Sequence, residues 1–237
     1  MIRDEAHLDE LLSTPSEADV SALRELEGDL ILLGVAGKMG PTLALRARRA
    51  SPQKRIIGVS RFSSPGLRTQ LEAAGVECIE ADLLDRDQVA SLPDAPNVVY
   101  LAGRKFGSSG DASLTWAMNA LAPANVCEHY RNSRIVAFSS GNIYPFLPAM
   151  SGGATEATPV APVGEYAQSV LARERVFDYY SRRYGTRVVL LRLNYAVEMR
   201  YGVLLDIGSA VYAGQAVSLG MGAANVIWQG DANSVSL

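Results

Sequence analysis

Short apolar runs recur along the chain, and polar or glycine-containing turns separate them from longer amphipathic stretches. The first run, residues 30–33, reads Leu-Ile-Leu-Leu and ends at Gly34. Continuous apolar runs of this length are typical of strands that are buried on both faces of a sheet. The pattern predicts strands at residues 30–33, 55–59, 76–80, 97–101, 134–138 and 187–191.

The stretches between these runs carry apolar residues at helical spacing, such as Leu43, Ala44 and Ala47 with arginines on the opposite side. Strands that alternate with helices indicate βαβ units and a parallel sheet. We therefore expect an α/β fold, a Rossmann-type doubly wound parallel sheet with helices on both faces. Besides the helix after Gly40, the pattern predicts helices at residues 64–75, 87–92, 111–130, 165–184 and 203–214.

The N-terminal segment and one long loop lie outside this alternation of strands and helices. Residues 1–28 precede the first strand and predict a helical arm, because Thr14-Pro15-Ser16-Glu17 has the spacing of a capping box. Residues 29–237 are then the main domain, with partial substrate-binding elements at 145–164 and 194–237. The first of these segments is rich in Pro, Gly and Ala and predicts a long loop, and such loops are usually functional.

Three glycines follow the first predicted strand. Gly34 allows a sharp turn, Gly37 lets backbone N–H groups approach a pyrophosphate, and Gly40 lets the next helix pack close to the strand. The positive end of that helix faces the phosphates. Ala36 stands where the commoner pattern has its second glycine, so a tight turn without a ligand is the alternative. The expected cofactor contacts here are Gly34, Gly37, Lys38, Met39 and Gly40.

Ligands of open α/β sheets bind outside the carboxyl ends of the strands. Ser60 and Arg61 follow the second strand, where an NAD site usually has an acidic residue. A hydroxyl and a guanidinium suit a 2′-phosphate better, so we expect NAD(P) with a preference for NADP. Asp82 is placed to accept a hydrogen bond from the adenine amino group, and Leu83 is placed to pack against the adenine ring. The alternative for Arg61 is a solvated side chain without a ligand, and the alternative for Asp82 is a turn residue.

Composition limits the other functions. The net charge of −3 argues against nucleic acid or an acidic membrane surface as the main partner, and no apolar run reaches the length of a membrane span. The N-terminus is too polar for a secretory signal. We expect a cytoplasmic protein with a small-molecule partner, in which Cys78 and Cys127 are reduced, and no metal site. A homodimer is compatible with the sequence but not required by it.

Several further motifs coincide with the ends of predicted strands and the starts of helices. They are the glycine turn, Asp82-Leu83, Ala102-Gly103-Arg104-Lys105, Asn119, Ser139-Ser140-Gly141-Asn142-Ile143-Tyr144 and Tyr166. With these motifs, residues 29 to about 231 resemble the extended short-chain dehydrogenase/reductases, which include nucleotide-sugar epimerases and dehydratases. The resemblance implies that Lys105 contacts the pyrophosphate or ribose, and that the cofactor set also includes Ala102, Gly103 and Asn119. It further implies a sugar or nucleotide-sugar substrate.

The same resemblance implies three catalytic groups. A tyrosine phenol exchanges a proton with the substrate, and a serine hydroxyl holds the same oxygen. A lysine four residues after the tyrosine lowers its pKa from about 10 and binds the nicotinamide ribose. Tyr166 and Ser140 match the first two positions, but Val170 stands at the third. Val170 shares the helix face of Tyr166, so an unassisted phenol is expected to stay neutral at pH 7. We expect Arg173, two turns along, to be too far to replace the lysine.

The end of the sequence also departs from the family. Residues 226–232 resemble the late strand after which the family continues, so we expect a truncated C-terminal substrate domain. Asn194 falls one residue short of a substrate-contacting asparagine. Two interpretations stay open: an NAD(P)-dependent epimerase/dehydratase-like oxidoreductase that acts by hydride transfer, or an NAD(P)-binding redox-sensing or assembly module with little turnover. Ser140 and Tyr166 favour the first, and Val170 and the short C-terminus the second.

Overall fold

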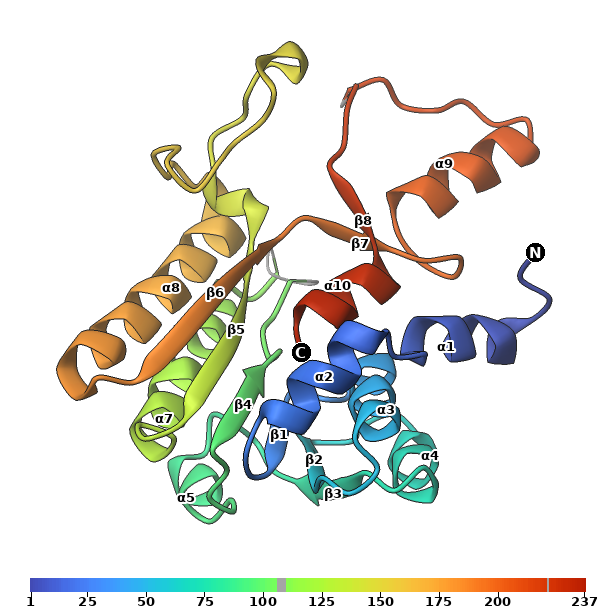
Figure 1. Ribbon diagram of the computed structural model, residues 1–237. Coiled ribbons are helices and arrows are strands. Elements are labelled where there is room, and N and C mark those ends of the chain that lie inside the picture. Colours follow the sequence, from blue (N-terminus) through green and yellow to red (C-terminus); the bar gives the residue numbers. More distant parts are fainter. Residues whose placement is uncertain (106–109, 221) are drawn as a thin grey trace.

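The six predicted strands form one parallel sheet (Figure 1). The computed structural model describes residues 1–105, 110–220 and 222–237. The strands are β1 (Leu30–Leu33), β2 (Ile56–Ser60), β3 (Glu77–Glu80), β4 (Asn97–Tyr100), β5 (Arg134–Ser140) and β6 (Arg187–Leu193). Their order across the sheet is β3-β2-β1-β4-β5-β6. The order reverses between β1 and β4, which is where open α/β sheets bind ligands.

Helices cover both faces of the sheet, which confirms the predicted fold class. One apolar core contains Leu43 and Leu71, from α3 (Gly40–Ala50) and α4 (Leu67–Ala73). The other contains Val126 and Phe177, from α7 (Ala122–His129) and α8 (Gly164–Tyr184). The short α5 (Arg86–Ala90) and α6 (Ala112–Trp116) belong to this second layer, in contact with α7 and α8 respectively.

The N-terminal arm consists of two helices, α1 (Glu5–Ser13) and α2 (Glu17–Glu25), and both pack on α3. The predicted capping box is wrong by two residues. Ser16 caps α2 and pairs with Asp19, because the helix begins after Ser16 rather than after Thr14. Asp19 also forms a buried ion pair with Arg46 of α3, at 2.7 Å between Oδ2 and Nε. The arm therefore packs on the surface of the domain.

Two predicted elements differ in the structure. The helix expected at 111–130 is interrupted by a π-helical turn, η1 (Ala117–Leu121), because the extra residue in that turn brings Asn119 to a fully buried position. Strands β5 and β6 are both two residues longer than predicted. Ser139 and Ser140 continue the ladder because they pair with Arg192 and Leu193, a contact between strands that the polar sequence does not reveal.

The C-terminal segment forms a small parallel sheet of β7 (Tyr195–Val197) and β8 (Val226–Trp228), with α9 (Val203–Tyr212) between them. The last helix, α10 (Gln229–Val235), returns to α3, where the side-chain amides of Gln229 and Asn233 donate to Thr42 at 3.1 and 3.0 Å. Residues 145–164 form the predicted loop, with one 3₁₀ turn at Ala149–Ser151. Within the three described ranges, no helix has the length and apolar character to cross a membrane.

Candidate functional site

The glycine turn joins β1 to α3 at the carboxyl edge of the sheet. Gly34 has φ 94°, and a Cβ there would lie 2.7 Å from the backbone nitrogen of Ala102. A Cβ at Gly40 would overlap the carbonyl oxygen of Val35. A Cβ at Gly37, in contrast, would meet among the described atoms only the Gly34 oxygen, at 3.3 Å. Packing therefore requires the first and third glycines, whereas the second faces space that a phosphate can fill.

The N-terminus of α3 is suited to an anion. No side chain caps it, and Pro41 occupies the first turn. The N–H groups and positive dipole end at such a terminus attract phosphate. Met39 is buried in the core, so only its backbone is available to a ligand, whereas Lys38 keeps solvent access although its ammonium is partly buried. The residues present in this turn therefore fit the pyrophosphate of a dinucleotide.

At the expected adenosine end of the site, Arg61 and Asp82 lie close to each other. Arg61 Nη1 lies 3.8 Å from Asp82 Oδ2, and both side chains are accessible. Asp82 also acts as a turn residue, since its Oδ1 accepts from the N–H of Leu84 at 3.0 Å. Leu83 is buried in the core, so its packing against an adenine ring stays a prediction. Ser60 ends β2, next to Arg61, as expected.

The loop after β4 is fixed by Asn119. The Asn119 side chain accepts from the N–H of Arg104 at 3.0 Å and donates to its carbonyl at 3.1 Å. It also donates to the Ser169 hydroxyl at 2.8 Å. Asn119 is fully buried and positions this loop, and a contact of Asn119 with a cofactor stays a prediction. Ala102 and Gly103 lie in the same loop, at the switch point between β1 and β4.

Lys38 points from the glycine turn towards the C-terminal segment. Its ammonium lies 4.0 Å from the ring centroid of Tyr201 and donates to the carbonyl of Ala196. Burial lowers the pKa of Lys38 to about 8, although the nearby Glu198 carboxylate opposes the shift. Part of the Lys38 population is therefore neutral at slightly alkaline pH.

A second lysine makes a similar contact nearby. The Lys105 ammonium lies 5.0 Å from the ring centroid of Tyr195, and burial lowers the pKa of Lys105. The pKa of Tyr201 is raised mainly by burial, with smaller contributions from Asp206, Tyr195 and Tyr166. Tyr166 is thus related to Tyr201 by this contribution. We refer to Lys38, Lys105, Tyr195 and Tyr201 as the lysine–tyrosine cluster.

Ser140 and Tyr166 lie on adjacent elements at this edge. Ser140 is 9% exposed and caps the 3₁₀ turn η2 (Gly141–Ile143), where its Oγ accepts from Asn142 N–H at 3.2 Å. That bond does not use the hydroxyl proton. Tyr166 lies in the first turn of α8, which packs against η2. Asn194 lies against Gly141, because a Cβ there would overlap the Asn194 Oδ1. Val170, one turn along α8, has no exposed surface.

A buried polar network, not identified from the sequence, joins α8 to β5 and β6. Glu174 is 2% exposed and accepts from Ser139 Oγ at 2.5 Å and from Arg192 Nε and Nη2 at 3.0 and 2.9 Å. Arg192 Nη1 also donates to the Tyr144 hydroxyl at 2.6 Å. The bond to Glu174 raises the pKa of Arg192. The available signal was the position of Glu174 on the helix face that carries Tyr166.

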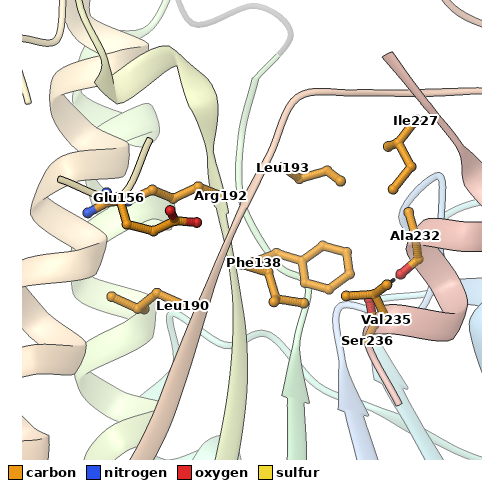
Figure 2. A pocket seen from close by; sticks show the side chains of 10 residues that line it. Phe138, Glu156, Leu190, Arg192, Leu193, Ile227, Ala232, Val235 and Ser236 are labelled. Carbon is orange, nitrogen blue, oxygen red and sulfur yellow. Dashed lines mark hydrogen bonds between the residues drawn. The ribbon is translucent and has the colours of Figure 1, made fainter. Parts of the chain in front are cut away.

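A groove of about 500 Å³ runs along the β6 edge, and Arg192 of this network is among its lining residues. Figure 2 shows Phe138 and Leu193 on the side of β6 that faces Ile227 and Ala232, with Arg192 on the opposite side. Its lining contains none of the predicted cofactor or catalytic residues. The chemistry-bearing groups therefore gather at the carboxyl edge and not in this groove.

A model of the NAD dependent epimerase/dehydratase family matches residues 30–197, which include the glycine turn, Ser140 and Tyr166. The chain belongs to this family. The match ends before Tyr201 and α9, so part of the lysine–tyrosine cluster lies beyond the segment that the family model covers.

Solved structures of other proteins share the fold. A dTDP-glucose 4,6-dehydratase from Streptomyces venezuelae, solved with NAD and TYD bound, is 20% identical with a TM-score of 0.74, over 88% of this chain and 70% of that one. A UDP-N-acetylglucosamine 4-epimerase from Methanobrevibacter ruminantium M1 is 20% identical with a TM-score of 0.73, over 89% and 72%. A curated 2-alkyl-3-oxoalkanoate reductase from Shewanella oneidensis is 25% identical over 178 residues. That match spans 73% of this chain and 44% of the relative's length.

Proposed function

We propose that this member of the epimerase/dehydratase family is an NAD(P)-dependent oxidoreductase that acts on a sugar or nucleotide sugar. The observation that carries the proposal is the convergence of three features at one sheet edge. These are the glycine turn with its uncapped helix, the Ser140 hydroxyl and the Tyr166 phenol. The solved structures named above include a dTDP-glucose 4,6-dehydratase and a UDP-N-acetylglucosamine 4-epimerase, which supports a nucleotide sugar as the substrate class.

The roles follow from the positions of the side chains. A bound nicotinamide would supply or accept the hydride. Ser140 would hold the substrate oxygen with its hydroxyl proton, and Tyr166 would exchange a proton with the same oxygen. Because Val170 brings no charge, the phenol is better suited to donate a proton than to accept one at neutral pH. This favours the reductive direction, and the curated relative is a reductase by name.

The preference for NADP is part of the proposal. Arg61 is 63% exposed and its contact with Asp82 is long, at 3.8 Å. Exposed ion pairs of this kind contribute little free energy, so Arg61 can turn to a 2′-phosphate at low cost. Ser60 beside it offers a hydroxyl. The remaining cofactor contacts are proposed at the glycine turn, Asp82, the loop after β4 and Lys105.

One alternative is supported by a specific observation. The buried Val170 removes the charge that the family resemblance places beside the tyrosine. A chain that binds NAD(P) but turns over slowly or not at all could serve as a redox-sensing or assembly module. The two functions differ in turnover, not in cofactor binding.

Cofactor binding is tested first. Gly37→Val should abolish NADH and NADPH binding in calorimetry, because the side chain would fill the space left for the pyrophosphate. The fold should persist, since a Cβ there meets no described atom closer than 3.3 Å. Gly208→Val is the matched control, because Gly208 of α9 has open space around its Cβ position. Unchanged dinucleotide affinity in Gly37→Val would refute the assignment.

Turnover is tested on a panel of nucleotide sugars and their keto forms. Tyr166→Phe and Ser140→Ala should each lower turnover by roughly 10²- to 10⁴-fold without weakening cofactor binding, the usual range for acid–base groups. Tyr212→Phe is the control, because the Tyr212 side chain is exposed. Cofactor binding without turnover on any panel member would favour the module instead.

A further inference from the structure

Arg173 is an unusual residue of α8. Its side chain is 6% exposed, and its Nη1 donates to the carbonyl of Phe138 on β5 at 2.8 Å. Its Nη2 donates to the Oδ1 of Asn119. A Cβ at Gly103 would overlap the same Nη2, so the guanidinium lies directly against the loop after β4. Arg173 thus connects the helix of Tyr166 to the two strand ends beside the glycine turn.

The buried charge of Arg173 has no carboxylate partner in the described part of the chain. The adjacent Glu174 is occupied by Arg192 and Ser139. The guanidinium carbon lies 5.8 Å from the ring centroid of Tyr100, a weak compensation. Its Nε is buried without a hydrogen-bond partner. A buried cation with an unused donor is costly, so its retention points to an anionic or hydroxyl-rich ligand.

The position of Arg173 suits that ligand. Gly103 is exposed at the carboxyl end of β4, and Ala102 beside it packs against Gly34 of the glycine turn. The guanidinium therefore lies at the switch point of the sheet, where a dinucleotide crosses from one half to the other. Long side chains in helices point back towards the N-terminus, so Arg173 reaches towards the strand ends from a turn beyond Val170.

We propose that Arg173 supplies the buried positive charge that holds the ribose-phosphate part of the dinucleotide at the ends of β4 and β5. This inference rests on the proposed cofactor binding. In this arrangement Arg173 provides a ribose-phosphate contact in place of a cation at position 170, where the buried Val170 brings no charge to the helix face of Tyr166. Cofactor binding and activation of the tyrosine, which one lysine would combine, are therefore separate in this chain.

The test compares the parent chain with Arg173→Gln and Arg173→Lys. Glutamine keeps a donor for the Phe138 carbonyl and removes the charge, whereas lysine keeps the charge. Calorimetry is done with NADH, ADP-ribose and AMP. The glutamine variant should weaken NADH and ADP-ribose by about tenfold or more and change AMP by less than about twofold, as expected for one lost charged contact. The lysine variant should recover most of the loss.

A second variant moves the guanidinium without removing it. Gly103→Ala places a methyl group on the position of Arg173 Nη2, which lies at the end of a flexible side chain and can shift. Gly103→Ala should weaken ADP-ribose binding by a larger factor in the parent than in the Arg173→Gln background, where only the contact of Gly103 itself with the cofactor is altered. If Arg173 had a purely structural role, Arg173→Gln would lower thermal stability and would change the affinities for AMP and ADP-ribose by the same factor.

The outcomes separate the two proposals. If the parent binds NADH and Arg173→Gln binds NADH and ADP-ribose equally well, this inference is wrong and the proposed function stands. If the parent binds neither NADH nor NADPH, the proposed function itself fails. If Arg173→Gln does not fold, Arg173→Met is measured in its place, because it removes the charge without leaving a buried polar group. Equal affinities of this variant and the parent for ADP-ribose would overturn the role of Arg173.

Discussion

Introducing a lysine at position 170 tests how charge is distributed along α8. Val170 is fully buried, and Arg173 lies three residues further on the same helix. Val170→Lys should therefore bury an ammonium beside an existing guanidinium that has no carboxylate partner in the described ranges. The single variant should be strongly destabilised, whereas Val170→Lys combined with Arg173→Met should be much less so, because the charge is then moved and not doubled.

The magnitude follows from the helix geometry. Side chains three residues apart have Cβ atoms about 5–6 Å from each other. Two unit charges about 6 Å apart repel by about 3 kcal/mol at an effective dielectric constant of about 20. The two substitutions should therefore show a coupling free energy of about 2–3 kcal/mol, well above the ~0.5 kcal/mol within which independent sites add.

The assay is a double-mutant cycle in urea, with the free energy of unfolding measured for the parent, both single variants and the double variant. The double variant should also recover dinucleotide affinity lost in Arg173→Met. The pH dependence of its turnover should differ from that of the parent, because a lysine then lies one turn from Tyr166 on the same helix face. Additive free energies would show that the two positions do not share one charge environment. A folded, cofactor-binding double variant with the parent's pH profile would show that Tyr166 is not the acid–base residue.

Three further predictions follow from other parts of the site. Arg61→Ala should remove about 1.5–3 kcal/mol of NADPH binding and little of NADH binding, and equal fluorescence titrations of both cofactors by the parent would contradict this. Affinity for NADH should fall as pH rises through about 8, because the lowered pKa of Lys38 means that its ammonium loses a proton there. Lys38→Arg should flatten that profile, and a flat profile in the parent would refute the role of Lys38. Gly40→Ala should cost roughly 1–3 kcal/mol in urea denaturation because its Cβ overlaps Val35, and Gly37→Ala should cost far less.

The strands could be predicted because a sheet covered on both faces requires continuous apolar runs, as in Leu30–Leu33. The same rule predicts that β5 ends at residue 138, two residues before its end in the structure. Ser139 and Ser140 are polar, and the ladder continues through them only because Arg192 and Leu193 pair with them from β6. Ser139 also donates to Glu174, a contact that spans 35 residues in sequence. No local pattern reports such a contact.

Other parts of the site depend on contacts between distant segments. The sequence pattern predicts one continuous helix through the π turn that contains Asn119, and the structure interrupts it there. The lysine–tyrosine cluster depends on β7, which has three residues and is too short to show a strand period. Arg173 was expected to be too far from Tyr166. The separation of Arg173 from Tyr166 along the helix does not tell where the guanidinium lies. In the structure it bonds to Phe138 and Asn119 at the strand ends.

Adjacent buried charges on α8 fix the orientation of the helix and thereby the chemistry of its first turn. Arg173 bonds to the Phe138 carbonyl, and Glu174 bonds to the Ser139 hydroxyl and Arg192, so the helix is held to β5 and β6 by directional contacts. Tyr166 is then positioned on a helix whose next turn carries Val170 in place of a charged residue. A tyrosine without that charge is better suited to give a proton to an oxygen that gains negative charge than to accept one from a hydroxyl. An enzyme with this arrangement should reduce a carbonyl at neutral pH faster than it oxidises the corresponding alcohol, and the oxidation should gain on the reduction as pH rises.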